Sequence, residues 1–186
     1  MTLSNTDPLT LDRVNGASPD EAAALLAGLY EHSPWVAEAA LAARPFVDVA
    51  ALKHAMSDAV RRASTDRQLA LIRAHPELAG KAMQAGALTR ESSHEQATSG
   101  LTHASLDELQ TLHTLNAEYH ARFGWPFVVA VRGPTGRGLT RDEIIATLRQ
   151  RLVSTPQVEL DECLRQIDRI AEIRLHERMG LSGEAS

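Results

Sequence analysis

Signals for the start of a helix recur along this 186-residue chain, and they limit its fold more than any other feature. Ser18-Pro19-Asp20-Glu21 and Ser105-Leu106-Asp107-Glu108 have the form of capping boxes, in which a hydroxyl and a carboxylate bind free amides of the first turn. Other helix starts are indicated at Ser33-Pro34, Asp48, Thr65, Thr140 and Pro156. Apolar residues at helical spacing follow them, so we expect a helix from each.

Only Phe127–Val131 has the pattern of an extended segment, and five residues cannot form a sheet alone. The sequence therefore predicts an all-α, single-domain bundle of seven to nine helices with one short extended segment near 127–131. We expect the domain to span residues 18–180, with flexible termini at 1–17 and 181–186.

Charge and composition argue against several classes of partner. The net charge is −5 and the arginines are dispersed, which disfavours nucleic acid or an anionic membrane. No apolar run approaches the roughly 20 residues of a membrane helix, and the N-terminus lacks the apolar core of a signal peptide. The single cysteine, Cys163, lies among apolar residues of a predicted helix, where we expect a buried thiol. We expect a cytoplasmic protein.

His75-Pro76 is the first candidate for chemistry. The residue before a proline is displaced from the helical conformation, so the His75 side chain can leave the helix and point into a cleft. Histidine can both donate and accept a proton near neutral pH. The alternative is a histidine that only forms a hydrogen bond at a helix end.

A second polar group follows at Ser92-Ser93-His94-Glu95-Gln96. Ser92 precedes Glu95 and Gln96 by three and four residues, so the three side chains can share one helical face. A carboxylate beside an amide can bind a urea-like or imide-like group. The alternative is a solvated helix start, with Ser92 as the cap.

The stretch from Asn116 to Val131 is the third candidate. A helix ends at Gly124, and the chain continues through Trp125-Pro126 into the extended run Phe127–Val131. Backbone groups of an extended run in an all-α protein need a ligand, water or a neighbouring segment as partner. A planar ring with amide-like edges would be a suitable ligand; the alternative is an apolar connector.

A metal site and a phosphate loop are disfavoured. The eight histidines form no His-Glu-x-x-His motif, and His113 and His120 alone would not make a site. The glycine-rich run 133–138 lacks the Gly-Lys-Ser/Thr ending of a phosphate loop, and a surface loop fits it better.

Three motifs in series resemble the OHCU decarboxylase family, where OHCU is 2-oxo-4-hydroxy-4-carboxy-5-ureidoimidazoline. They are His75-Pro76-Glu77-Leu78-Ala79-Gly80, Ser92-x-x-Glu95-Gln96-Ala97-x-x-Gly100-Leu101 and Asn116-x-x-Tyr119-x-x-Arg122-Phe123-Gly124-x-Pro126-Phe127-Val128. The resemblance covers about residues 18–180. Trp125 departs from the phenylalanine common in the family, which suggests a narrower pocket or a small shift of the substrate ring.

The resemblance implies an all-α homodimeric carboxy-lyase of urate degradation that forms (S)-allantoin and CO2 without a cofactor. It implies that His75 is catalytic, and we expect Glu95 to assist it across one small cavity. It also implies substrate-binding positions at Pro76, Ser92, Ser93, His94, Glu95, Gln96, Phe127, Val128, Val129, Ala130 and Val131. Arg122, Arg169 and Arg174 are open candidates for the substrate carboxylate.

Two other functions stay open from the residues alone. A related ureide or imidazoline lyase could use the same pocket for another ring. A non-catalytic helical adaptor would explain the amphipathic helices and the acidic balance, but it gives no reason to gather His75, Glu95 and Gln96 beside an extended run.

Overall fold

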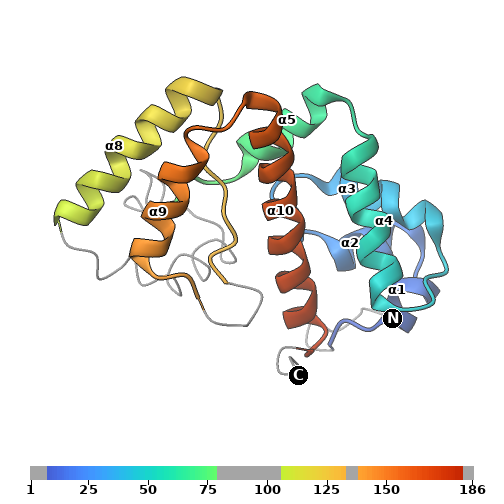
Figure 1. Cartoon of the computed structure of the whole chain (residues 1–186). Coiled ribbons are helices and arrows are strands. Elements are labelled where there is room, and N and C mark those ends of the chain that lie inside the picture. The colour runs from blue at the N-terminus through green and yellow to red at the C-terminus, as the bar shows by residue number, and fades with distance from the viewer. Residues whose placement is uncertain (1–7, 79–105, 133–137, 182–186) are drawn as a thin grey trace.

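The computed structural model describes residues 8–78, 106–132 and 138–181, and within them it contains eight α-helices and one 3-10 turn (Figure 1). The elements before the first gap are α1 (Leu11–Gly16), α2 (Pro19–Leu26), α3 (Pro34–Ala40), the 3-10 turn η1 (Leu41–Ala43), α4 (Val49–Arg62) and α5 (Thr65–Ala74). Those after it are α8 (Leu106–Phe123), α9 (Arg141–Arg151) and α10 (Pro156–Arg178). The described ranges hold no strand, only an isolated bridge between Arg132 and Gly138, so the all-α prediction is confirmed.

The helix starts follow the capping chemistry of the sequence. The capping boxes of α2, at Ser18 and Glu21, and of α9, at Thr140 and Glu143, are both complete. Asp48 caps α4 by accepting a hydrogen bond of 2.7 Å from the amide of Ala51. The helix predicted near residues 89–101 and the cap at Ser105 lie outside the described residues.

Helix α1 lies within the stretch 1–17, for which the sequence indicated flexibility. Thr10 caps it, and its Val14 side chain is completely buried. Leu9, just before it, is also buried, and its amide donates to the carbonyl of Arg178 at the end of α10. The packed part of the chain thus includes residues well before Ser18.

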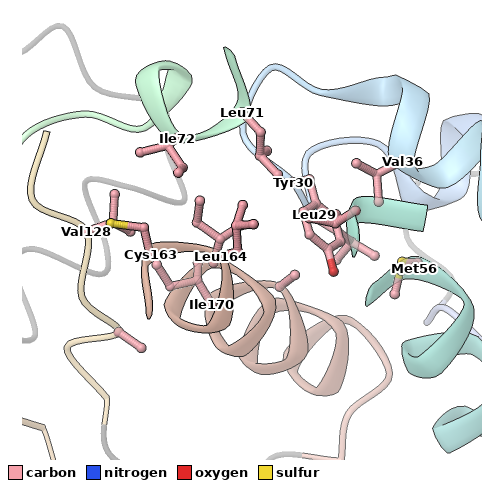
Figure 2. Packing of buried hydrophobic residues seen from close by; sticks show 14 of the residues in the cluster. Leu29, Tyr30, Val36, Met56, Leu71, Ile72, Val128, Cys163, Leu164 and Ile170 are labelled. Carbon is pink, nitrogen blue, oxygen red and sulfur yellow. The ribbon is translucent and has the colours of Figure 1, made fainter. Parts of the chain in front are cut away.

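The long helix α10 runs between two groups of helices (Figure 1). It packs against α4 and α5, while α3 packs against α4 and α8 against α9. Figure 2 shows Leu164 and Ile170 of α10 in the same cluster as Ile72 and Val128 on one side and Leu29 on the other. The buried residues Leu160, Leu164, Ile167 and Ile170 recur every three or four positions on α10, so one apolar stripe joins the elements that form the candidate site.

No helix in the described ranges is both long enough and apolar enough to cross a membrane.

Replacing Asp48 with alanine should lower the free energy of unfolding by about 1 kcal/mol, because the amide of Ala51 loses its side-chain acceptor. Urea unfolding followed by circular dichroism would measure this loss. The matched control is Val47→Ala, a change at a neighbouring side chain that is 88% exposed, with an expected effect within about 0.5 kcal/mol. Equal effects of the two substitutions would contradict a capping role for Asp48.

Candidate functional site

His75 lies at the end of α5, where the following proline stops the helix. Its backbone has φ −76° and ψ 134°, the extended conformation expected before a proline, and its amide donates to the carbonyl of Ile72. The side chain is only 6% exposed. His75 therefore combines both alternatives of the sequence: it ends the helix, and its ring is buried in the interior.

The hydrogen bond at one ring nitrogen defines the tautomer of neutral His75. Nδ1 lies 3.0 Å from the carbonyl oxygen of Leu71, and a carbonyl oxygen can only accept. The proton of the neutral ring is therefore on Nδ1. Nε2 then carries a lone pair, and this buried atom has no hydrogen-bond partner among the described residues. It is free to accept a proton from a bound molecule.

Burial lowers the pKa of His75 from 6.5 to about 4. The Leu71 carbonyl and the carboxylate of Glu31 act against this shift, while the charges of Arg174 and His32 add to it. At neutral pH the ring is therefore uncharged. It can act first as a base and cannot serve as a ready-made cationic acid.

One cavity brings two of the predicted groups together. It is lined by His75 and Pro76 and by the whole run Phe127–Val131, with an empty volume of about 540 Å³ that includes the open solvent at its mouth. Four residues that were not predicted to bind the substrate complete the described lining: Leu78, which belongs to the first motif, and Arg132, Ile170 and Ile173. Segments more than fifty positions apart in the sequence thus share one small site.

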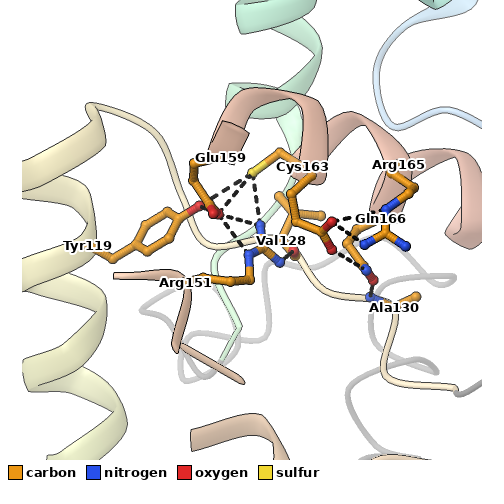
Figure 3. Close-up of polar contacts among 9 residues, drawn as sticks. Tyr119, Val128, Ala130, Arg151, Glu159, Cys163, Arg165 and Gln166 are labelled. Carbon is orange, nitrogen blue, oxygen red and sulfur yellow. Dashed lines mark hydrogen bonds and ion pairs between the residues drawn. The ribbon is translucent and has the colours of Figure 1, made fainter. Parts of the chain in front are cut away.

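Side chains hold the run 127–131 from the side of α9 and α10 (Figure 3). Arg151 donates a hydrogen bond of 2.6 Å to the carbonyl of Val128, and the amide of Ala130 donates one of 2.9 Å to Oε1 of Gln166. The carbonyl of Val131 accepts from the amide of Leu139. The sequence left a ligand, water or a neighbouring segment as possible partners of these backbone groups. For these three groups, the partner is a neighbouring segment.

The segment after His75 is held in a similar way. The side-chain amide of Asn116, on α8, donates a hydrogen bond of 2.8 Å to the carbonyl of Leu78, and both residues are buried. Asn116 begins the third sequence motif and Leu78 belongs to the first. This contact joins the third motif to the first at Leu78, which lines the cavity.

The second polar motif, Ser92 to Gln96, lies outside the described residues, and so does the predicted approach of Glu95 to His75. Both stay predictions.

The three candidate arginines are not among the residues that line this cavity. Arg122 donates to the carbonyl of Ser154, and Arg174 is buried in an ion pair of 2.9 Å with Glu31. Arg169 lines a separate depression between α4 and α10. The arginine in the described part of the lining is Arg132, which pairs with Glu177. In the sequence, Arg132 is a single arginine that follows an apolar run, and this pattern does not indicate a binding site.

Trp125 does not line the cavity. It is buried and stacks on Phe123, with ring centroids 5.7 Å apart. The suggestion that it narrows the pocket by direct contact therefore finds no support in the described lining.

The described residues contain no group of three or more histidine, cysteine, aspartate or glutamate side chains placed to hold a metal ion. His113 and His120 are both exposed on α8. Cys163 is buried as predicted, and burial raises the pKa of its thiol. This thiol has no access to the solvent and is a poor nucleophile.

The chain matches known proteins over almost its whole length. The sequence model of a family described as OHCU decarboxylase matches residues 15–176. The 2-oxo-4-hydroxy-4-carboxy-5-ureidoimidazoline decarboxylase of Haloferax volcanii is 39% identical over 170 residues, which are 91% of this chain and 96% of that protein. The protein of the same name from Mus musculus is 34% identical and covers 90% and 92% of the two chains.

Two solved structures are also similar. A crystal structure of (S)-allantoin synthase superposes with a TM-score of 0.73 at 29% identity; the match covers 92% of this chain, which spans 54% of that longer chain. A crystal structure of an OHCU decarboxylase in the presence of (S)-allantoin superposes with a TM-score of 0.63 and covers 80% of this chain and 93% of that one. At 21% identity, the second comparison supports the fold alone.

Acid should destabilise the protein through His75. The unfolded chain binds a proton at this histidine with the ordinary pKa of 6.5 and the folded chain with a pKa of about 4, so the unfolded state holds more protons between these values. The contribution of neutral His75 is complete above pH 6.5 and is lost as the pH falls through about 4. It amounts to roughly 3 kcal/mol.

Urea unfolding of the parent and of His75→Gln at pH 7 and pH 4 would measure it. The parent should lose about 3 kcal/mol more than the variant, because glutamine does not titrate. His113→Gln, which removes an exposed histidine, should keep the pH dependence of the parent. Identical losses in the parent and in His75→Gln would show that the pKa of His75 is not lowered.

Proposed function

Because the chain belongs to the OHCU decarboxylase family, we propose that it converts OHCU to (S)-allantoin and CO2 in the degradation of urate. The observation that carries this function is the neutral, buried His75, which lines a cavity formed with the run 127–131 and whose Nε2 has no partner among the described residues. A base of this kind, in a small site beside an irregular backbone segment, suits a small, polar ring.

The substrate itself supplies the electron sink. Its carboxylate is on ring carbon 4, next to the C=N bond at ring carbon 5. When the bond to CO2 breaks, its electron pair forms a double bond between carbons 4 and 5 and moves the C=N pair onto nitrogen. The resulting enol becomes allantoin when the hydroxyl on carbon 4 loses its proton and carbon 5 gains one. The overall reaction consumes one proton, which the ring nitrogen takes from solvent.

His75 is suited to both proton steps of the enol, the loss of the hydroxyl proton and the gain of a proton at carbon 5. In the neutral tautomer with the proton on Nδ1, the lone pair of Nε2 accepts the proton of the hydroxyl group and can then deliver it to carbon 5. Delivery from one side of the ring gives one enantiomer. The Leu71 carbonyl stabilises the imidazolium that exists between the two steps, because its hydrogen bond from Nδ1 is stronger when the ring is charged.

The other proposed roles follow the sequence motifs. Glu95 orients the hydroxyl group or His75 and destabilises the substrate carboxylate, and Ser92 and Gln96 bind the ureido and carbonyl groups. Backbone amides in the run Phe127–Val131 bind the edge of the ring. Pro76, Ser93 and His94 complete the set of predicted contacts. A homodimeric assembly, a cytoplasmic location and the absence of a cofactor also stay predictions.

The burial of His75 argues against the adaptor alternative. An adaptor would have no use for a histidine that is 6% exposed in a cavity. A related lyase acting on another ureide ring stays the second candidate, and comparing turnover of OHCU with that of other ureide rings separates the two.

Replacing His75 with alanine should abolish the stereochemical control. Since OHCU also decays spontaneously to racemic allantoin, the measurement is the circular dichroism of the product from freshly generated substrate. The parent should produce (S)-allantoin, and His75→Ala should lower kcat by roughly 10²–10⁴-fold, the range typical of proton-transfer catalysis. His113→Ala is the matched control with an exposed histidine and should behave as the parent. If His75→Ala formed (S)-allantoin at the parent rate, another group would be the base.

The pH dependence of kcat/KM should lack an inflection near pH 6.5. This ratio reports the ionisation of the free enzyme, in which the pKa of His75 is lowered to about 4. The base is therefore already unprotonated at pH 5.5, and we expect less than a twofold loss of kcat/KM between pH 7.5 and 5.5. A tenfold loss over this range, absent in a parallel assay of spontaneous decay, would contradict the lowered pKa.

A further inference from the structure

A buried polar cluster lies next to Val128 (Figure 3), and none of its members lines the cavity. We define this cluster as Tyr119 of α8, Arg151 of α9, and Glu159 and Cys163 of α10. Tyr119, Glu159 and Cys163 have no exposed surface, and Arg151 is 6% exposed. Removing two charges from water is costly unless each is well paired, so this arrangement needs an explanation beyond packing.

The guanidinium of Arg151 is the centre of the cluster. Its Nε and Nη2 lie 2.8 and 2.5 Å from Oε1 of Glu159, and Nη2 also lies 3.2 Å from the sulfur of Cys163. The hydroxyl of Tyr119 donates to the same oxygen of Glu159. Burial opposes the charge of Arg151, but the hydrogen bond to Glu159 and the neighbouring groups raise its pKa overall. The guanidinium is therefore held as a cation in one orientation.

The remaining face and edge of this guanidinium contact the cavity wall. Nη1 donates to the carbonyl of Val128 at 2.6 Å, and the carbon of the group lies 4.7 Å from the centre of the Phe127 ring. The Phe127 ring also contacts the Tyr119 ring edge-on, with ring centroids 5.4 Å apart. One side chain thus orients both the ring of Phe127 and the peptide group between Val128 and Val129.

We propose that Arg151, oriented by Glu159 and Tyr119, is a positioning residue that holds Phe127 and Val128 in the geometry that binds the substrate. The proposal rests on the function proposed above, since it concerns the affinity of that site. Arg151 does not line the cavity itself. It acts on the site through its contacts with two lining residues, Phe127 and Val128. A lysine could keep the charge opposite Glu159, but its single ammonium could not also match the Val128 carbonyl and lie flat on the Phe127 ring.

The test compares steady-state kinetics of the full-length parent and Arg151→Lys with fresh OHCU. We expect KM to rise about tenfold, the equivalent of one well-formed charged contact, while kcat changes less than threefold because His75 is untouched. A purely structural role would instead lower the fraction of folded enzyme, and this would lower the apparent kcat at an unchanged KM. Val60→Ala, a core change on α4 away from the cavity, is the control for lost stability and should leave KM unchanged.

Tyr119→Phe gives a second, milder test, which also decides the matter if Arg151→Lys does not fold. It removes the hydroxyl that helps to orient Glu159 and retains the ring that contacts Phe127. We expect KM to rise two- to threefold at constant kcat, roughly the effect of weakening one hydrogen bond. An unchanged KM in every folded variant, with a parent that forms (S)-allantoin, would overturn the positioning role alone. A parent that leaves the product racemic would overturn the proposed function, and the positioning role with it.

Discussion

Two buried ion pairs, one towards each end of α10, are the contacts on which the rest of the structure depends. Glu159 in its first turns pairs with Arg151, and Arg174 in its last turns pairs with Glu31 at 2.9 Å. A buried charge without a partner costs several kcal/mol, so each pair allows few alternative positions of the helix. The apolar stripe between them holds α10 against α4 and α5, but apolar contacts alone would tolerate small shifts along the helix axis. The pairs remove that freedom, and they do so beside the cavity, where small shifts matter most.

Both ion pairs act on the site at short range. Arg151, the partner of Glu159, also donates a hydrogen bond to the carbonyl of Val128. The opposite charges of Glu31 and Arg174 shift the pKa of His75 in opposite directions. Because these two effects oppose each other, burial is left as the main cause of the low pKa of the histidine. Among the described residues, Glu31 and Arg174 act on His75 as an ion pair, so the fold keeps the histidine neutral although two charged side chains lie near it.

The sequence predicted the parts of the structure that depend on neighbouring residues. Caps such as Ser18 and Asp48, the helix stop at His75-Pro76 and the buried position of Cys163 all follow from local chemistry, and the structure confirms them. It could not predict which distant groups would meet. Glu31 and Arg174 are 143 positions apart, and nothing near either residue indicates the other. Ile170 and Ile173 line the cavity, yet their three-residue spacing is that of any buried helical stripe. The resemblance supplied Phe127–Val131 as a binding segment, whereas only the structure shows that Arg151 and Gln166 hold it.

The contact between His75 and Leu71 connects the helix stop to the chemistry. A helix that ends leaves its last carbonyls without intrahelical partners, and the carbonyl of Leu71, four residues before His75, is one of them. The imidazole that leaves the helix at the proline satisfies this carbonyl with Nδ1. The same bond therefore completes the helix and selects the tautomer whose Nε2 can accept a proton. If the proline stood one residue later, His75 could keep the helical conformation, and its own amide would donate to the carbonyl of Leu71. The imidazole would then have no free carbonyl to bind there. In this way the position of Pro76, a matter of backbone geometry, determines which nitrogen of His75 is basic.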